Sequence, residues 1–283
     1  MDIKKIMIIG AGQMGAGIAQ VFAQAGYEII LNDIKEEFVE KGISGIEKGM
    51  KRRIEKGKME ESVMNKTLSL ISPSTNYSDA QNADLVIEAA TENESIKLDI
   101  FKQLDEFAPE HTILATNTSS LSITKIAAAT NRPDKVAGFH FFNPVPVMNL
   151  IEVNLALQTS NETKEALEEL GKSIDKTVII ANDTPGFVVN RLLIPMINEA
   201  IFILESGTVT AESIDKAMEL GANHPMGPLS LADLIGLDTV LAIMETLYKG
   251  FKDQKYRPSL LLTKYVEAGK LGRKTGEGFF KYD

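Results

Sequence analysis

The sequence contains no cysteine, and this absence removes several kinds of chemistry. Without a thiol there is no disulfide framework, no thiolate nucleophile and no metal site with cysteine ligands. Histidine is scarce as well: only His111, His140 and His224 occur, and no two of them have the spacing of a metal-ligand motif. We therefore expect neither cysteine chemistry nor a bound metal.

Long apolar runs and an excess of positive charge are also missing. No apolar stretch approaches the ~20 residues that a membrane-spanning helix needs. Lys and Arg number 30 against 39 Asp and Glu, so the formal net charge is −9, whereas a nucleic-acid partner requires a basic face. The N-terminus lacks the regions of a signal peptide. These features predict a cytoplasmic protein with no membrane and no nucleic-acid partner.

The start of the chain carries the glycine motif on which the other expectations depend. An apolar run at residues 3–9 leads into Gly-x-Gly-x-x-Gly, a helical pattern follows, and a second apolar run ends at Asp33. The turn and the helix start comprise Gly10, Gly12, Gln13, Met14 and Gly15. Glycine allows a tight turn from strand to helix and the close approach of a pyrophosphate, and the first N–H groups of the helix then face the phosphates. We therefore expect a dinucleotide at this turn; the alternative is a glycine-rich turn without a ligand.

Asp33 indicates which dinucleotide binds. A carboxylate at the end of the second strand can accept hydrogen bonds from the adenosine ribose hydroxyls, whereas it repels the 2′-phosphate of NADP. Lys35, two residues later, weakens this preference. The sequence therefore favours NAD(H) as the cofactor.

The apolar pattern divides the 283 residues into two parts. Residues 1–183 alternate between apolar strands and helices, which is typical of a mostly parallel α/β sheet. The rest is helical in pattern, apart from a strand-like stretch at 278–282, and Pro185 and Gly186 mark the junction. We predict a Rossmann-type N-terminal domain over residues 1–183, followed by an all-α C-terminal domain over residues 184–283.

Polar loops follow two further apolar strands of the first part. A strand at 85–89 leads into a loop with Glu88 and Glu92, and a strand starting at Thr112 runs into the polar loop at 117–120. Ligands of open parallel sheets bind at the carboxyl ends of the strands, so both loops should lie along the same rim as the glycine turn. For the two serines of the second loop, helix capping is the alternative role.

The stretch at 135–153 carries a candidate acid/base. It is predicted to form a strand that ends at His140, a turn shaped by prolines, and a second strand that carries Glu152. A histidine suits general acid/base work because its intrinsic pKa is near neutrality, and a carboxylate on its other nitrogen would fix its tautomer. A core histidine bonded to the backbone is an equally good interpretation from spacing alone.

A basic cluster lies in a helix that we expect over residues 36–58, before a short strand expected at 68–72. Its cations are Lys48, Lys51, Arg52, Arg53, Lys56 and Lys58. In an acidic chain such a cluster could bind a phosphorylated substrate. A solvated helix face is the preferred interpretation from the sequence alone.

Taken together, seven segments resemble the L-3-hydroxyacyl-CoA dehydrogenase family, in the family's order and over almost the whole chain. They are GAGQMGAGIA (10–19), IEAATEN (87–93), NTSSLSI (117–123), GFHFFNPVPVM (138–148), DTPGFVVNRLL (183–193), GANHPMGPLSLAD (221–233) and GRKTGEGFFKY (272–282). The fourth and fifth segments are far more specific than the glycine motif. The length matches a stand-alone enzyme rather than a fusion with a hydratase, and the resemblance is closest to bacterial short-chain members.

The resemblance implies roles for individual residues. His140 corresponds to the catalytic acid/base and Glu152 to the carboxylate that pairs with it, while Ser119 and Asn190 match polar residues around the substrate oxygen. The implied cofactor contacts are Glu92, Lys97, Asn117, Ser119, Asn143 and Lys274. The implied contacts with the coenzyme A moiety are Arg52, Lys56 and Ser119. At Gly49 this chain departs from relatives that carry a serine in contact with coenzyme A.

The resemblance also implies an activity, namely NAD(H)-dependent interconversion of a short-chain 3-hydroxyacyl-CoA and the corresponding 3-ketoacyl-CoA. It implies an active site between the two domains and a homodimer formed through the C-terminal domain. Two alternatives stay open. One is a related dehydrogenase that acts on a hydroxy acid or sugar acid without coenzyme A, and the other is a dinucleotide-binding protein without turnover.

Overall fold

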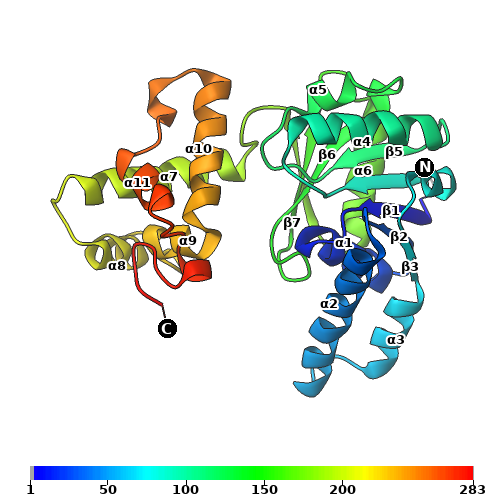
Figure 1. Cartoon of the computed structure of the whole chain (residues 1–283), viewed down its shortest axis with the longest axis horizontal. Helices are drawn as coiled ribbons and strands as arrows, with labels where there is room; N and C mark the ends of the chain where they lie inside the picture. Colours follow the sequence, from blue (N-terminus) through cyan, green and yellow to red (C-terminus); the bar gives the residue numbers. More distant parts are fainter. Residues whose placement is uncertain (1–2, 283) are drawn as a thin grey trace. The chain divides into compact units, whose positions relative to one another are not determined.

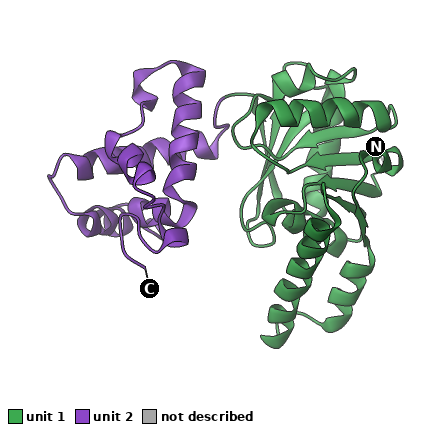
Figure 2. Cartoon of the chain, in the orientation of Figure 1, with its two compact units in different colours: residues 1–184 green, residues 185–283 purple. Residues whose placement is uncertain are grey.

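The computed structural model describes residues 3–282 and contains two compact units (Figure 2). The division between them falls between Thr184 and Pro185, at the proline that the sequence analysis identified as a junction. The first unit contains the whole sheet, and the second is built from helices.

The first unit is organised around an eight-stranded sheet with the order β3-β2-β1-β4-β5-β6-β7-β8. Its strands are β1 (Lys5–Ile9), β2 (Glu28–Asn32), β3 (Ile71–Ser74), β4 (Leu85–Glu88), β5 (Ile113–Thr116), β6 (Val136–Phe141), β7 (Leu150–Leu155) and β8 (Thr177–Asn182). All neighbouring pairs are parallel except β6 and β7, which are antiparallel. The predicted fold class, a mostly parallel Rossmann-type sheet followed by helices, is therefore confirmed.

Six α-helices accompany the sheet in the described part of this unit (Figure 1). They are α1 (Gln13–Gln24), α2 (Glu36–Glu55), α3 (Glu61–Ser69), α4 (Glu94–Phe107), α5 (Ile123–Ala127) and α6 (Asn161–Ser173). The inner strands are mostly apolar because helices cover them, and every residue of β4, β5 and β6 is buried. The aromatic rings of Phe22, Phe139 and Phe141 meet in this core at centroid distances of 5.0 to 6.4 Å.

Two expectations about the basic region were wrong. Residues 61–69 form helix α3, and the strand begins only at Ile71, because Met64 and Leu68 are at helical spacing and both contact the core from the helix. Helix α2 ends at Glu55, so Lys56 is its C-cap residue and does not lie within it. Together α2 and α3 form a helical hairpin that extends away from the sheet (Figure 1).

The second unit contains the helices α7 (Val189–Glu205), α8 (Ala211–Gly221), α9 (Pro228–Ile235), α10 (Leu237–Phe251) and α11 (Leu260–Glu267). They enclose a separate apolar core to which Ile197, Leu229 and Met244 contribute. Among residues 3–282, no helix combines the length and the apolar character needed to cross a bilayer.

The strand expected at 278–282 does not form. The segment makes isolated antiparallel bridges, and a buried carboxylate on α9 holds it instead: Asp233 accepts hydrogen bonds from the N–H groups of Phe279 and Phe280 and from the hydroxyl of Tyr282. Burial and the neighbouring Asp233 raise the pKa of Tyr282 to about 12. The apolar residues Phe279 and Phe280 thus pack against the core of the second unit and do not mark strand pairing.

Two glycines of α2 differ in what surrounds them, and this difference can be tested. A Cβ atom at Gly42 would lie 2.6 Å from the carbonyl oxygen of Ala11, whereas nothing lies within 4 Å of one at Gly49. Gly49→Ala should therefore raise the free energy of unfolding by about 0.5–1 kcal/mol, since alanine favours helix. Gly42→Ala should lower it by about 1–3 kcal/mol, because α2 must move away from the glycine turn. Urea denaturation of the two variants measures both effects, and equal changes would show that α2 does not pack closely on the turn.

Candidate functional site

Polar side chains gather at the carboxyl ends of the parallel strands. The glycine turn follows β1, Asp33 follows β2, the loop at 89–93 follows β4, the loop at 117–122 follows β5, and His140 lies near the end of β6. Because these strands are parallel neighbours, all five features lie along one rim of the sheet.

The glycines of the turn are required by close contacts. Gly10 has φ +98°, and a Cβ atom there would lie 2.7 Å from the carbonyl oxygen of Ala89. A Cβ atom at Gly15 would lie 1.8 Å from the carbonyl oxygen of Gly10, so helix α1 can approach the strand only without one. By contrast, nothing lies within 4 Å of a Cβ atom at Gly12, which leaves its backbone open to a ligand.

The start of α1 offers hydrogen-bond donors that the protein does not use. The N-cap residue Gly12 has no side chain to accept a bond, and the N–H groups of Gly12, Gln13 and Met14 donate to no acceptor among residues 3–282. Orphan N–H groups and the positive end of the helix dipole form an anion site. This arrangement fits the diphosphate of a dinucleotide.

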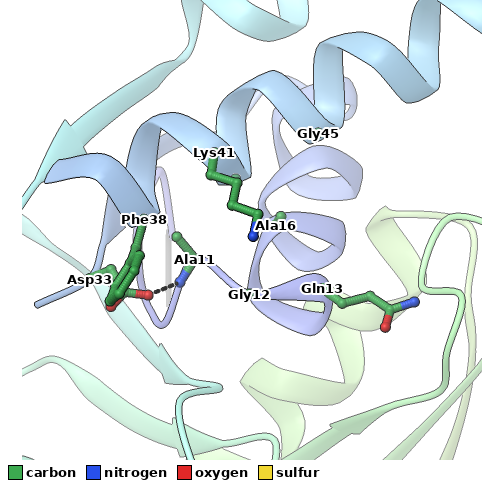
Figure 3. Close-up of a pocket in the computed structure, with 9 residues that line it drawn as sticks. Ala11, Gly12, Gln13, Ala16, Asp33, Phe38, Lys41 and Gly45 are labelled. Carbon is green, nitrogen blue, oxygen red and sulfur yellow. Dashed lines mark hydrogen bonds between the residues drawn. The ribbon is translucent and has the colours of Figure 1, made fainter. Parts of the chain in front are cut away.

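Asp33 is held in place by two backbone N–H groups. Ala11 donates to its Oδ2 and Ile34 donates to its Oδ1, both at 2.7 Å. The carboxylate lines a pocket of about 350 Å³ that lies beside the glycine turn and the first part of α2 (Figure 3). Each oxygen keeps a further lone pair for a ribose hydroxyl. The geometry is therefore compatible with the predicted role of Asp33 at the adenosine ribose, which stays a prediction.

Glu88 is the last residue of β4 and is completely buried, although the sequence placed it in the following loop. Its Oε2 accepts hydrogen bonds from Lys97 Nζ at 2.5 Å and from Thr116 Oγ1 at 2.8 Å. Its Oε1 accepts one from the N–H of Ala90 at 2.8 Å. One carboxylate thus connects β4, its loop, α4 and β5.

Lys97 is buried as well, with 2% of its surface exposed, so its ammonium group is directed inward to Glu88. It also lies 3.8 Å from Glu92 Oε2. This places the expected cofactor residue Lys97 behind the rim, next to the more exposed Glu92.

Glu92 binds the polar loop after β5. Its Oε1 accepts hydrogen bonds from the Ser119 N–H at 2.7 Å and from Ser119 Oγ at 3.0 Å, and its Oε2 accepts one from Thr118 Oγ1 at 2.7 Å. The structure thus brings Glu92 and Ser119 together. Helix capping does not explain Ser119, because the cap of α5 is Ser122, whose hydroxyl accepts the Lys125 N–H.

Two asparagines stabilise the rest of the rim. Asn117 Oδ1 accepts the backbone N–H of Phe141 at 2.8 Å, which joins the β5 loop to the end of β6. Asn143 Oδ1 accepts a hydrogen bond from Gln13 Nε2 at 3.0 Å, which joins the turn after His140 to the start of α1. Both asparagines thus stabilise the rim, and the cofactor contacts that the family resemblance implies for them stay predictions.

Lys176 is a buried cation at the site that the sequence analysis missed. Its ammonium group donates to the carbonyl oxygens of Val145 at 3.0 Å and Met148 at 2.7 Å, and burial lowers its pKa. It thereby secures the turn that follows Asn143. Nothing in the local pattern of residues 174–178 signals this role, because the turn and the lysine are about 30 residues apart.

His140 and Glu152 lie directly opposite each other in the antiparallel pair β6–β7. His140 Nδ1 is 2.8 Å from Glu152 Oε2, and both residues are buried. The imidazole lies against Phe142, with ring centroids 4.6 Å apart. The proximity that spacing alone left undecided is therefore present, and Nδ1 is the ring nitrogen that faces the carboxylate.

The remaining predicted residues belong to other elements of the chain. Asn190 is on α7 and Lys274 is in a helical turn of the second unit, where Lys274 Nζ lies 2.5 and 2.6 Å from the two oxygens of Asp238. Arg52 and Lys56 are exposed at the end of α2 and form no ion pair among residues 3–282. In the described part of the chain, no group of three or more His, Asp and Glu side chains could hold a metal ion.

The buried carboxylate gives a stability prediction. Glu88→Gln removes the buried counter-charge of Lys97, leaving only the more exposed Glu92 at 3.8 Å, and should lower the free energy of unfolding by about 3–5 kcal/mol. Thr116→Val removes one neutral donor and should cost about 1 kcal/mol. The double variant Glu88→Gln/Lys97→Met removes both charges and should recover most of the loss. Chemical denaturation measures all three; a double variant no more stable than Glu88→Gln would contradict the importance of this ion pair.

Comparison with known proteins agrees with these features. The family model described as 3-hydroxyacyl-CoA dehydrogenase, NAD binding domain, matches residues 5–184, and the C-terminal domain of the same family matches residues 186–282. The chain is 53% identical over 283 residues to a probable 3-hydroxybutyryl-CoA dehydrogenase of Bacillus subtilis, covering 100% of this chain and 99% of that protein. It is 47% identical over 288 residues to human mitochondrial hydroxyacyl-coenzyme A dehydrogenase, covering 99% and 91%. The crystal structure of (S)-3-hydroxybutyryl-CoA dehydrogenase from Ralstonia eutropha superposes with a TM-score of 0.97 at 50% identity, covering 100% of both chains. The chain therefore belongs to the 3-hydroxyacyl-CoA dehydrogenase family, and it is an oxidoreductase that uses NAD(H).

Proposed function

We propose that this chain is a 3-hydroxybutyryl-CoA dehydrogenase that interconverts (S)-3-hydroxybutyryl-CoA and acetoacetyl-CoA, with His140 as general acid/base. The observation that carries the proposal is the buried His140–Glu152 pair on the rim of an NAD-binding sheet. Relatives named for this activity match the chain over its whole length, which supports the short-chain substrate.

The chemistry follows from the orientation of the imidazole. Because Nδ1 faces Glu152, Nε2 is the nitrogen that exchanges a proton with the substrate. In oxidation Nε2 takes the proton of the 3-hydroxyl group, and in reduction it returns a proton to the ketone oxygen. Glu152 fixes the tautomer and the orientation of the ring, because its carboxyl group lies against Nδ1. The bound nicotinamide supplies the hydride chemistry.

Ser119 and Asn190 complete the proposed set of groups at the substrate oxygen. The hydroxyl of Ser119 is fixed by Glu92, so its oxygen has a defined position. The amide of Asn190 can donate a hydrogen bond to an oxygen on which negative charge develops. We propose Arg52 and Lys56 for the phosphates of coenzyme A, and their lack of carboxylate partners within residues 3–282 of an acidic chain supports this assignment.

The organisation of the molecule adds two proposals. The NAD-binding domain would comprise residues 1–183 and the helical domain residues 184–283, close to the observed division between units. A homodimer would form through the helical domain, whose surface exposes large apolar side chains. These are Leu192, Leu220, Leu234 and Leu260. The cytoplasmic location stays a prediction from the sequence.

The substrate proposal is tested by following NADH oxidation with three acceptors. We expect turnover with acetoacetyl-CoA, slower turnover with longer 3-ketoacyl-CoA thioesters and almost none with free acetoacetate, because the latter lacks the coenzyme A moiety. NADPH should be a poor donor, since Asp33 repels its 2′-phosphate. Equal turnover with free acetoacetate would favour a dehydrogenase that acts without coenzyme A, and NADH binding without any turnover would favour a non-catalytic protein.

The role of His140 is tested by substitution. His140→Gln should lower kcat by roughly 10²–10⁴-fold, with little change in NADH affinity, because only the proton-transfer group is lost. His111→Gln is the matched control, since His111 is exposed and precedes β5 at the opposite end of that strand. Stopped-flow and steady-state assays measure kcat, and fluorescence titration measures NADH affinity. A kcat near normal in His140→Gln would exclude His140 as the acid/base.

A further inference from the structure

A lysine that none of the sets above includes faces the glycine turn. Lys41 lies on α2, and its side chain extends across the pocket toward the first turn of α1, with its ammonium group beside Ala16 (Figure 3). Gly12 and Asp33 line the same pocket of about 350 Å³. A cation is therefore directed at the helix start whose N–H groups have no acceptor.

The ammonium group of Lys41 has no partner. Among residues 3–282 it forms no hydrogen bond and no ion pair, although nearby lysines do. Lys35 lies 3.6 Å from Glu37, and Lys51 lies 2.6 Å from Glu47. In a chain with a net charge of −9, carboxylates are abundant, yet none in the described part of the chain neutralises this cation. Two sources of positive potential, the helix start and Lys41, thus point into one pocket.

Gly45 supplies an independent observation. It lies one turn after Lys41 on α2 and lines the same pocket, and a Cβ atom there would meet nothing within 4 Å. Glycine disfavours helix, and at Gly42 a close contact with Ala11 explains its presence. At Gly45 no such contact exists, so packing does not require glycine. A longer side chain at this position would fill the space in front of Lys41.

We propose that Lys41 binds a phosphate group seated over the first turn of α1 and that Gly45 keeps the space for it open. The ligand is a diphosphate ester, and two reactants could provide it: NAD(H) and a coenzyme A thioester. The second source rests on the proposed function, whereas the first rests only on the NAD-binding domain.

The first experiment compares Lys41→Met with Lys66→Met. Lys66 is an exposed lysine near the end of α3, so its substitution changes the net charge by the same amount away from the pocket. If NAD(H) provides the phosphate, fluorescence titration at low ionic strength should give a Kd for NADH raised roughly tenfold in Lys41→Met and less than about twofold in Lys66→Met; if the thioester provides it, the same contrast should appear in KM for acetoacetyl-CoA. The difference should shrink at high salt, because screening weakens an exposed ion pair. Equal effects of the two substitutions on both the Kd for NADH and the KM for acetoacetyl-CoA would contradict the proposal, because Lys41 would then act only through the net charge of the protein.

The second experiment separates ligand binding from stability. Gly45→Met fills the pocket yet adds a better helix former, so the Tm should stay equal or rise while the affinity for the diphosphate ligand falls roughly tenfold. Gly45→Ala should have a smaller effect on affinity. A variant with raised Tm and unchanged affinity for both reactants would overturn the proposal.

Two measurements on Lys41→Met, the Kd for NADH and the KM for thioesters, identify the source of the phosphate. If NAD(H) provides it, the Kd for NADH rises. If the thioester provides it, the Kd for NADH is unchanged, and KM rises for acetoacetyl-CoA but not for acetoacetyl-pantetheine, which lacks the diphosphate. If neither the Kd for NADH nor the KM for acetoacetyl-CoA changes, the proposal is wrong. Absence of turnover with every thioester would reject the proposed function, and the NADH titration would still test Lys41.

Discussion

The carboxylate of Glu88 is the constraint on which the rim depends. It is buried at the end of β4, and three donors, from the following loop, α4 and β5, satisfy it. Because an unpaired buried charge is costly, these elements keep one arrangement. Lys97 in turn lies beside Glu92, which holds Ser119 by two hydrogen bonds. A buried ion pair thus determines where an exposed hydroxyl lies.

The reversal of β7 has a comparable effect on the proposed acid/base. An antiparallel neighbour places residues of two consecutive strands directly opposite each other, and side chains on the same face of such a pair are within contact distance. His140 and Glu152 form one of these register pairs. If β7 were parallel to β6, the chain would need a long crossover connection between the two strands. The short turn between Phe141 and Leu150 permits only the antiparallel arrangement. The His–Glu contact therefore forms between β6 and β7, the antiparallel pair of the described sheet.

Features encoded locally could be predicted from the sequence, and features that depend on distant residues could not. The glycine turn, Asp33 and the strand ends at the rim follow from short-range patterns, and the structure has them. The helix at 61–69 was missed because its apolar residues also fit a short strand, and the period is ambiguous over so few positions. The inward direction of Lys97 and the role of Lys176 depend on partners far along the chain or across the fold, so no local pattern reveals them. The family resemblance implies a cofactor contact for Lys97 but does not indicate that its charge is buried.

Helix α2 presents a cationic face in an acidic molecule. Lys41, Lys48 and Arg52 are seven and four residues apart, so an ideal helix places them within about 40° of one another, and none has a carboxylate partner among residues 3–282. Elsewhere on this helix, Lys51 is neutralised by Glu47. Unpaired cations on one helix face repel each other, and in the free protein no ion pair offsets this repulsion. Their arrangement therefore lowers the free energy of unfolding unless an anion binds. The two proposed reactants each carry a diphosphate, and this face begins at the glycine turn and continues toward Lys56. The electrostatics of α2 are therefore better explained by phosphate binding than by solubility, which a net charge of −9 already provides.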